Sequence, residues 1–70
     1  MAIVVNLDVM LARRKMKMKD LAAAVDVSVT NLSLLKNGHV RGIRFATLEA
    51  LCQVLQCQPA DLLEYREDNP

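Results

Sequence analysis

Four side chains fall on one face of a short helix predicted between residues 28 and 37, and their chemistry suits contact with DNA base edges. They are Val29, Thr30, Ser33 and Leu34. Each residue turns about 100° around a helix, so these four lie away from Ser28, Leu32 and Leu35, which should face the core. Hydroxyl groups hydrogen-bond to several bases, and apolar side chains contact thymine methyl groups. We therefore expect a base-reading surface of modest sequence discrimination.

The apolar members of this surface leave a second interpretation open. Val29 and Leu34 stand where a base-reading helix typically carries Arg, Gln or Asn, which pair bidentately with base edges. In the alternative hypothesis they pack against another protein or a neighbouring subunit. The chain would then be an interaction module or co-regulator with weak or no DNA binding.

A second set of residues suits contact with DNA phosphates. Lys17 and Lys19 come at the start of a predicted helix, where backbone N–H groups and the helix dipole favour an anion. Arg41 and Arg44 follow the helix that carries the base-reading face. The other candidates are Ser28, Asn31, Lys36, Asn37 and His39. His39 is a lone histidine in a loop, which fits a solvated residue or a phosphate contact but not a metal ligand.

The elements that must position these side chains form a helix-turn-helix motif over about residues 18–37. A first helix is predicted from Met18 to Val25, and Asp26-Val27 makes the turn. The second helix begins after a capping serine, Ser28, and ends at Asn37-Gly38, where glycine can adopt the left-handed conformation. In such a motif the second helix usually enters a DNA major groove.

Three further helices and a short strand complete the predicted fold, which is all-α with strand content only at the termini. The helices are expected at about 7–15, capped by Asn6, at about 45–56, and at 59–63. Phe45 is expected to anchor the 45–56 helix in the core, together with Leu48, Leu51, Cys52 and Leu55. Residues 2–5 are apolar and mostly β-branched, so they predict a strand. Its partner is either the C-terminal segment around Tyr65, within an otherwise polar tail at 64–70, or the same strand of another subunit.

Charge is distributed unevenly along the 70 residues. Residues 1–44 hold eight basic and three acidic side chains, a net charge of +5, whereas residues 45–70 hold one basic and five acidic side chains, a net charge of −4. A basic half fits an anionic partner such as nucleic acid. Ordinary charge scatter on a solvated surface explains the same pattern equally well. Arg13, Arg14 and Lys15 likewise fit either DNA contact or the stabilisation of a helix C-terminus by cations.

Several classes of protein and site are disfavoured. Cys52 and Cys57 have neither a zinc-site spacing nor a disulfide framework, and Cys52 fits a small buried hydrophobe better than a reactive thiol. No metal cluster, phosphate-binding glycine loop or nucleophile–histidine–acid set is present, so we expect neither an enzyme nor a cofactor. No apolar run approaches a membrane span, and Met1 to Val5 is too short for a signal peptide. We expect a cytoplasmic protein.

A set of motifs runs through nearly the whole chain. It consists of Asp20-Leu21-Ala22, Val27-Ser28, Leu32, Leu35, Asn37-Gly38, Thr47-Leu48, Leu51-Cys52, Leu55 and Gln58 to Tyr65. Over about residues 6–63 the chain thereby resembles the Cro-type, phage-repressor-like (XRE) helix-turn-helix regulators. Its C-terminal part is similar to a subgroup of very small, stand-alone bacterial members. The resemblance implies a single five-helix, lambda-repressor-like DNA-binding domain over residues 1–70, acting as a transcriptional regulator and often as a dimer.

The resemblance also implies roles for individual positions. The base-contacting positions of the family fall on Val29, Thr30, Ser33 and Leu34, and its phosphate-contacting positions fall on Lys17, Met18, Asn37 and the loop after Gly38. Three residues depart from the family pattern. Met18 replaces a glutamine and removes a polar phosphate contact, and Lys17 replaces a Ser or Thr helix cap. Asp26 replaces a turn glycine, and aspartate tolerates the left-handed conformation at some cost.

Together these observations predict a homodimer that binds double-stranded DNA, with a protein partner as a further candidate. No small-molecule effector domain is expected.

Overall fold

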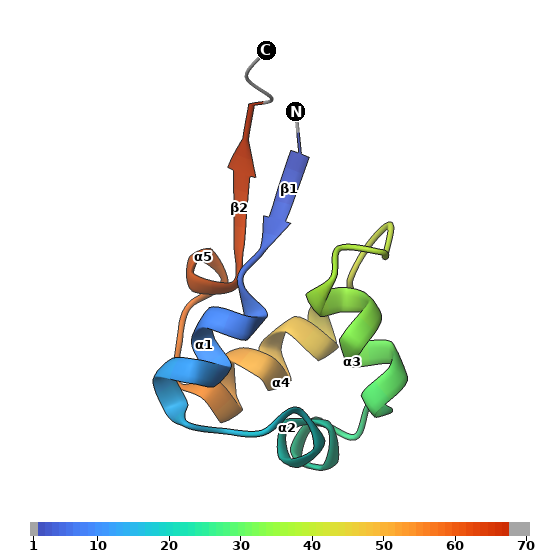
Figure 1. Ribbon diagram of the computed structural model, residues 1–70, viewed down its shortest axis with the longest axis vertical. Coiled ribbons are helices and arrows are strands. Elements are labelled where there is room, and N and C mark those ends of the chain that lie inside the picture. The colour runs from blue at the N-terminus through green and yellow to red at the C-terminus, as the bar shows by residue number, and fades with distance from the viewer. Residues whose placement is uncertain (1, 68–70) are drawn as a thin grey trace.

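The computed structural model describes residues 2–67, which form five helices and a two-stranded sheet (Figure 1). The elements are β1 (Ala2–Val5), α1 (Leu7–Arg14), α2 (Met18–Val25), α3 (Val29–Lys36), α4 (Phe45–Leu55), α5 (Pro59–Leu62) and β2 (Leu63–Arg66). All five predicted helices and the predicted N-terminal strand are present. The fold is therefore mostly helical, and its small sheet lies at the two ends of the described chain.

The two strands form a ribbon that projects from the helical body (Figure 1). β1 pairs with β2 in an antiparallel register that sets Ile3 opposite Tyr65 and Val5 opposite Leu63. The partner of β1 is thus the C-terminal segment of its own chain. Within the predicted polar tail, residues 64–66 are therefore strand rather than irregular chain, as one of the two alternatives had it, because pairing with β1 satisfies the backbone of this segment.

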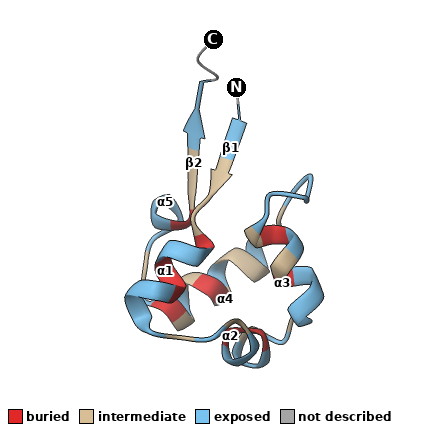
Figure 2. Ribbon diagram, viewed as in Figure 1, coloured by how far each residue is buried: buried red, intermediate tan, exposed pale blue. Residues whose placement is uncertain are grey.

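The core is built almost entirely from leucine. The buried residues are Leu7, Met10, Leu11, Leu21, Ala22, Leu32, Leu35, Leu51, Leu55 and Leu62. They come from all five helices, and Figure 2 shows these buried positions in red along the ribbon. α2 packs against both α3 and α4, so the helix-turn-helix pair is held in place by α4.

Phe45 does not anchor α4 in the core. Its side chain is 84% exposed, whereas Leu51 and Leu55 are 1% and 0% exposed. Phe45 lies six residues before Leu51 on the same helix. At about 100° per residue, this spacing places Phe45 about 120° away from Leu51 around the helix axis and off the buried face. Leu48 and Cys52 flank that face and are half-buried rather than buried.

Asn6 precedes α1 as predicted, but its side chain does not cap the helix. Instead, its Nδ2 donates a hydrogen bond to Oε1 of Glu64 at 2.8 Å, and its backbone N–H donates to the carbonyl of Leu62 at 2.8 Å. Asn6 therefore occupies the predicted cap position, but it makes no side-chain cap, because its amide group is engaged by the ribbon.

Each of the first four helices ends in the same kind of turn. A residue in the left-handed conformation follows the helix: Lys15, Asp26, Gly38 or Gln56, with φ of 52°, 57°, 75° and 51°. The N–H of the next residue then donates to the carbonyl five positions earlier: Met16 to Leu11, Val27 to Ala22, His39 to Leu34 and Cys57 to Cys52, at 2.9–3.1 Å. This Schellman arrangement satisfies helix-end carbonyls and brings the two bonded positions together.

Candidate nucleic-acid interface

The turn between α2 and α3 sets the orientation of the candidate base-reading helix. Asp26 adopts the left-handed conformation, with φ 57° and ψ 44°, at the position where the family pattern has glycine. Ser28 is extended, and its Oγ accepts a hydrogen bond from the N–H of Asn31 at 3.1 Å. The predicted serine cap is confirmed. Ser28 is exposed, however, so its predicted place on the core-facing side was wrong; a capping hydroxyl must reach around the helix end.

α3 has one buried face and one open face. Leu32 and Leu35 are 1% and 8% exposed and anchor the helix in the core. The open face carries Val29 and Leu34, which are 45% and 42% exposed, together with the exposed Thr30 and the half-buried Ser33. The four predicted base-reading residues therefore share the side of α3 that can meet a partner.

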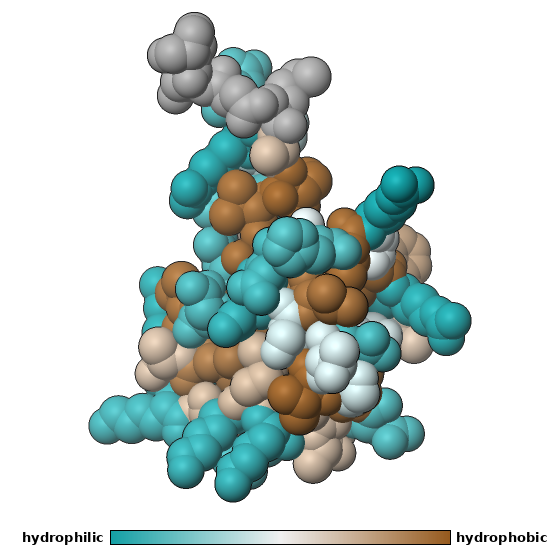
Figure 3. Space-filling model, turned by 45° about the vertical axis from the view of Figure 1, so that its right-hand side comes forward, coloured by the Kyte–Doolittle hydropathy of each residue, from teal (hydrophilic) through white to brown (hydrophobic). Residues whose placement is uncertain are grey.

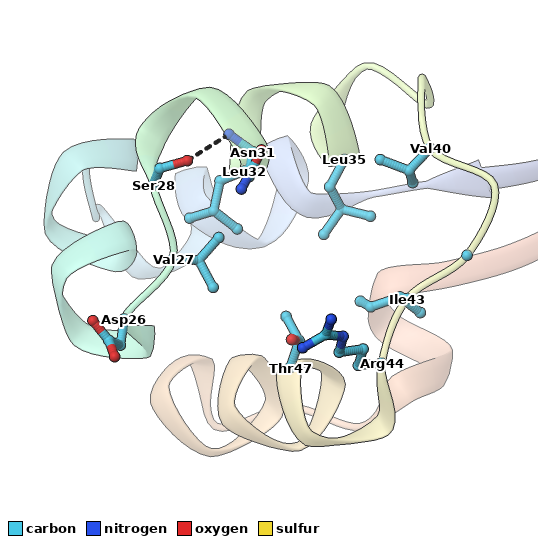
Figure 4. Close-up of a pocket in the computed structure, with 11 residues that line it drawn as sticks. Asp26, Val27, Ser28, Asn31, Leu32, Leu35, Val40, Ile43, Arg44 and Thr47 are labelled. Carbon is cyan, nitrogen blue, oxygen red and sulfur yellow. Dashed lines mark hydrogen bonds between the residues drawn. The ribbon is translucent and has the colours of Figure 1, made fainter.

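A pocket of about 430 Å³ lies between α3 and the start of α4 (Figure 4). Its apolar walls include Val27, Leu32 and Ile43. Polar groups on its rim come from Ser28, Asn31, Arg44 and Thr47. The fold thus gathers three predicted phosphate contacts, Ser28, Asn31 and Arg44, around one hollow.

A second hollow, of about 420 Å³, lies between α2 and the start of α3 and places Lys19 beside Ser28 and Val29. One lysine predicted to contact phosphate and one residue predicted to read bases therefore border the same depression. Thr47 of the first pocket had no assigned role in the sequence analysis. Its only signal was its place in the Thr47-Leu48 motif.

The basic residues of this region are available for an anionic partner. Lys17, Lys19, Arg41 and Arg44 are exposed and Lys36 is half-buried. None of the five pairs with a carboxylate of another described residue, whereas Arg66 on the ribbon binds Glu64 at 2.9 Å. His39 and Asn37 are exposed at the end of α3, next to the left-handed Gly38.

The start of α2 presents its backbone rather than a side-chain cap. Lys17 occupies the cap position without a side-chain hydrogen bond to the first turn. The first N–H groups of the helix have no partner within the helix itself, which suits an anion, although Asp20 in the same turn opposes one. The Met18 side chain packs against the core and carries no donor, so Met18 can offer only its backbone N–H.

Arg14 is not part of this surface. Its Nε donates to the carbonyl of Leu55 at 2.6 Å, and its Nη2 donates to the carbonyl of Gln56 at 2.9 Å. Arg14 therefore caps the C-terminus of α4 from α1. One interpretation of the sequence had Arg14 stabilise the C-terminus of its own helix as a cation. The structure places Arg14 at the C-terminus of α4 instead.

Other kinds of site find no support within residues 2–67. In that part of the chain no three or more His, Cys, Asp or Glu side chains gather where a metal ion could be held. None of its helices has the length and apolar content needed to span a membrane.

Comparison with known proteins agrees with this geometry. The family model described as the Cro/C1-type HTH DNA-binding domain matches residues 6–68. The chain is also 56% identical over 68 residues to YozG of Bacillus subtilis (strain 168), described as an uncharacterized HTH-type transcriptional regulator; the match covers 97% of this chain and 81% of YozG. With its α2–turn–α3 unit and a family match over nearly its whole length, this chain belongs to the Cro/C1-type helix-turn-helix DNA-binding family.

Proposed function

We propose that the protein regulates transcription by placing α3 in the major groove of a specific double-stranded DNA site. The observation that carries this proposal is the division of α3 into a face anchored by Leu32 and Leu35 and an open face. Near that open face lie exposed basic side chains that pair with no carboxylate among residues 2–67. Membership of a DNA-binding family and the description of YozG as a transcriptional regulator support it. The chain acts by occupying DNA, in the cytoplasm, and catalyses no reaction.

The residues divide by role. The residues that contact base edges are Val29, Thr30, Ser33 and Leu34. They belong to a helix-turn-helix motif at about residues 18–37, which lies inside a single domain. The phosphate contacts come from Lys17, Met18 through its backbone, Lys19, Ser28, Asn31, Lys36, Asn37, His39, Arg41 and Arg44. Hydroxyl and apolar readers discriminate bases less sharply than bidentate Arg, Gln or Asn pairs. Phosphate contacts therefore supply most of the affinity.

The protein binds as a homodimer, with two copies of α3 in successive major grooves about one helical turn, roughly 34 Å, apart. The ribbon offers the contact between copies. A two-stranded sheet leaves both strands with a free edge, and β1 carries no charged residue to protect its edge, whereas β2 carries Glu64 and Arg66. Ile3, 63% exposed, adds apolar surface beside that edge. Figure 3 shows apolar side chains where the ribbon projects from the helical body.

Fluorescence anisotropy on DNA from just upstream of the protein's own gene, against a scrambled duplex at two salt concentrations, tests DNA recognition. Tighter binding to the upstream DNA is expected to persist near 150 mM salt, the roughly physiological range in which specific binding is judged. Lys19→Ala and Arg41→Ala should each weaken binding to both duplexes and lower the salt slope by about 1. Arg13→Ala removes the same charge from an exposed position on α1 and should leave the slope unchanged. Equal affinity for both duplexes, or no binding, contradicts the proposal.

The exposed apolar side chains of α3 favour one alternative, a protein-interaction module that keeps the fold. Val29 and Leu34 expose more than two fifths of their surface, which a protein partner would cover as readily as thymine methyl groups. In that case Leu34→Glu abolishes capture of the partner, while Lys19→Ala and Arg41→Ala have little effect. The same three variants therefore separate the two functions.

A further inference from the structure

The turn that ends α4 brings the two cysteines of the chain together. Gln56 adopts the left-handed conformation, with φ 51°, and the N–H of Cys57 donates to the carbonyl of Cys52 at 3.0 Å. In this Schellman turn the side chains at the two bonded positions are placed to touch. The sequence analysis found neither a zinc-site spacing nor a disulfide framework in this pair and treated Cys52 as a small buried hydrophobe.

The pair has a distinctive composition among the helix ends of this fold. The equivalent positions hold Leu11 and Met16 at the end of α1, Ala22 and Val27 at the end of α2, and Leu34 and His39 at the end of α3. None of these pairs can form a disulfide. At the end of α4 both positions hold a free thiol, and both side chains are half-buried against the core.

The backbone places the two cysteines beside each other, and the pKa of Cys57 agrees with this placement. Burial is the main cause of the raised pKa of Cys57, and the neighbouring Cys52 adds to the rise. Because the hydrogen bond from the N–H of Cys57 to the carbonyl of Cys52 holds the two positions together, the folded turn raises the effective concentration of each thiol at the other.

We propose that Cys52 and Cys57 form a reversible intramolecular disulfide by exchange with small-molecule disulfides such as oxidised glutathione. One thiol loses its proton and attacks a sulfur of the glutathione disulfide, which forms a mixed disulfide and releases one glutathione. The second thiol loses its proton and displaces the remaining glutathione, closing the bond between the cysteines. The protein loses two electrons and two protons, and one glutathione disulfide becomes two glutathione thiols.

The new bond would tie down a turn that already joins three elements. Arg14 of α1 holds this turn through the carbonyls of Leu55 and Gln56, and α5 begins directly after it at Pro59. A fold that holds two thiols together favours their disulfide, so by linkage the disulfide favours the fold. The oxidised chain should therefore melt at a higher temperature than the reduced chain.

Equilibration of the full-length chain in glutathione redox buffers, followed by alkylation of remaining thiols and intact-mass measurement, tests the proposal. The expected product is lighter than the reduced chain by two hydrogen atoms, carries no glutathione and has no disulfide to a second chain. It should form at a more reducing glutathione ratio in native buffer than in concentrated urea. Oxidation at the same ratio in both solvents, an accumulated glutathione adduct, or a cross-linked dimer would each overturn it.

Single-cysteine variants supply the matched control. Cys52→Ser and Cys57→Ser each keep one thiol, so the exchange should stop at the mixed disulfide with glutathione. Circular dichroism establishes that each variant is folded, and Cys52→Ala or Cys57→Ala replaces any variant that is not. If both folded single-cysteine variants resisted glutathione while the wild type closed its disulfide, the two-step route would be contradicted, because one of the two thiols must make the first attack.

Discussion

Residues other than glycine occupy three of the four left-handed helix ends. Lys15, Asp26 and Gln56 have φ between 51° and 57°, where a side chain with a Cβ atom costs about 1–2 kcal/mol relative to ordinary backbone conformations. The turns form nevertheless, because each closes a helix-end hydrogen bond and directs the next segment into the core. This residual strain leaves room for stabilising substitutions.

Replacing Gln56 with glycine should stabilise the protein by about 0.5–1 kcal/mol, because glycine adopts the left-handed conformation without a steric penalty. Gln53→Gly is the matched control, since Gln53 is exposed within α4 three residues earlier. There glycine should destabilise by about 1 kcal/mol. Urea denaturation measures both changes, and shifts of the same sign would contradict the conformational argument.

Phe45 and Leu51 should respond oppositely to truncation despite sharing α4. Leu51→Ala removes a side chain that is 1% exposed and should destabilise the protein by about 2–5 kcal/mol. Phe45→Ala removes one that is 84% exposed and should change stability by less than about 0.5 kcal/mol. Thermal unfolding of the two variants measures the contrast. A large loss in Phe45→Ala would mean that the ring is covered in solution.

At the scale of elements, the contact between α1 and α4 depends on a charged cap. Arg14 donates to two carbonyls at the end of α4, and these carbonyls have no partner within the helix to replace it. Arg14→Ala should therefore destabilise the protein by about 1–2 kcal/mol.

The neighbouring Arg13 is exposed and serves as the control, with an expected change below about 0.5 kcal/mol for Arg13→Ala. Urea denaturation separates the two variants. Since Arg14 lies outside the proposed interface, folded Arg14→Ala should bind DNA with the affinity of the wild type. A lower affinity of the folded variant would place Arg14 at the DNA.

The ribbon is joined to α1 by a carboxylate, which makes this junction sensitive to pH. Hydrogen bonds from Arg66, and then from Asn6, hold the pKa of Glu64 below its ordinary value of 4.5. A lowered folded-state pKa means that the carboxylate stabilises the fold above the unfolded value and that this contribution is lost as pH falls through the folded value. The Glu64 side chain is 38% exposed, so solvent screens its charge and the effect is small.

Glu64→Gln should accordingly lower the Tm at pH 7, and the difference from the wild type should shrink as the pH is lowered toward 3. Differential scanning calorimetry at both pH values measures it. A difference that is the same at both values would show that the charge of Glu64 does not contribute.

For the whole molecule, the free edge of β1 bears on oligomeric state. Ile3 and Tyr65 face each other across the ribbon and are 63% and 56% exposed. An antiparallel pairing of β1 with β1 of a second copy would join the two ribbons into one four-stranded sheet and satisfy the free backbone edge of β1, and it is self-complementary as a two-fold interface requires.

Ile3→Lys should shift the protein toward monomer in sedimentation velocity, because a lysine on an edge strand opposes pairing with a second strand. Val9→Lys changes an apolar residue of α1 that is 43% exposed and should leave the dimer intact. A dimer that survives Ile3→Lys would place the interface elsewhere, and a monomeric wild type would exclude it altogether.

Local sequence determined most of the fold. Helix positions followed from apolar periodicity and from capping residues such as Ser28, while Gly38 marked the end of α3, because these signals act within a few residues of the chain. The division of α3 into core and open faces was predictable for the same reason. The family followed from motifs spread over the whole length.

Only the tertiary structure decided features that join distant segments. One is the pairing of β1 with β2. Another is the hydrogen bond from Asn6 to Glu64, which joins residues 58 positions apart. A third is the capping of α4 by Arg14, whose bond to Leu55 joins residues 41 positions apart. The exposure of Phe45 depended on which side of α4 its neighbours cover. The local sequence favours a side-chain helix cap and a hydrogen bond to a distant residue equally. The packing that brings the distant partner within reach decides which of the two forms.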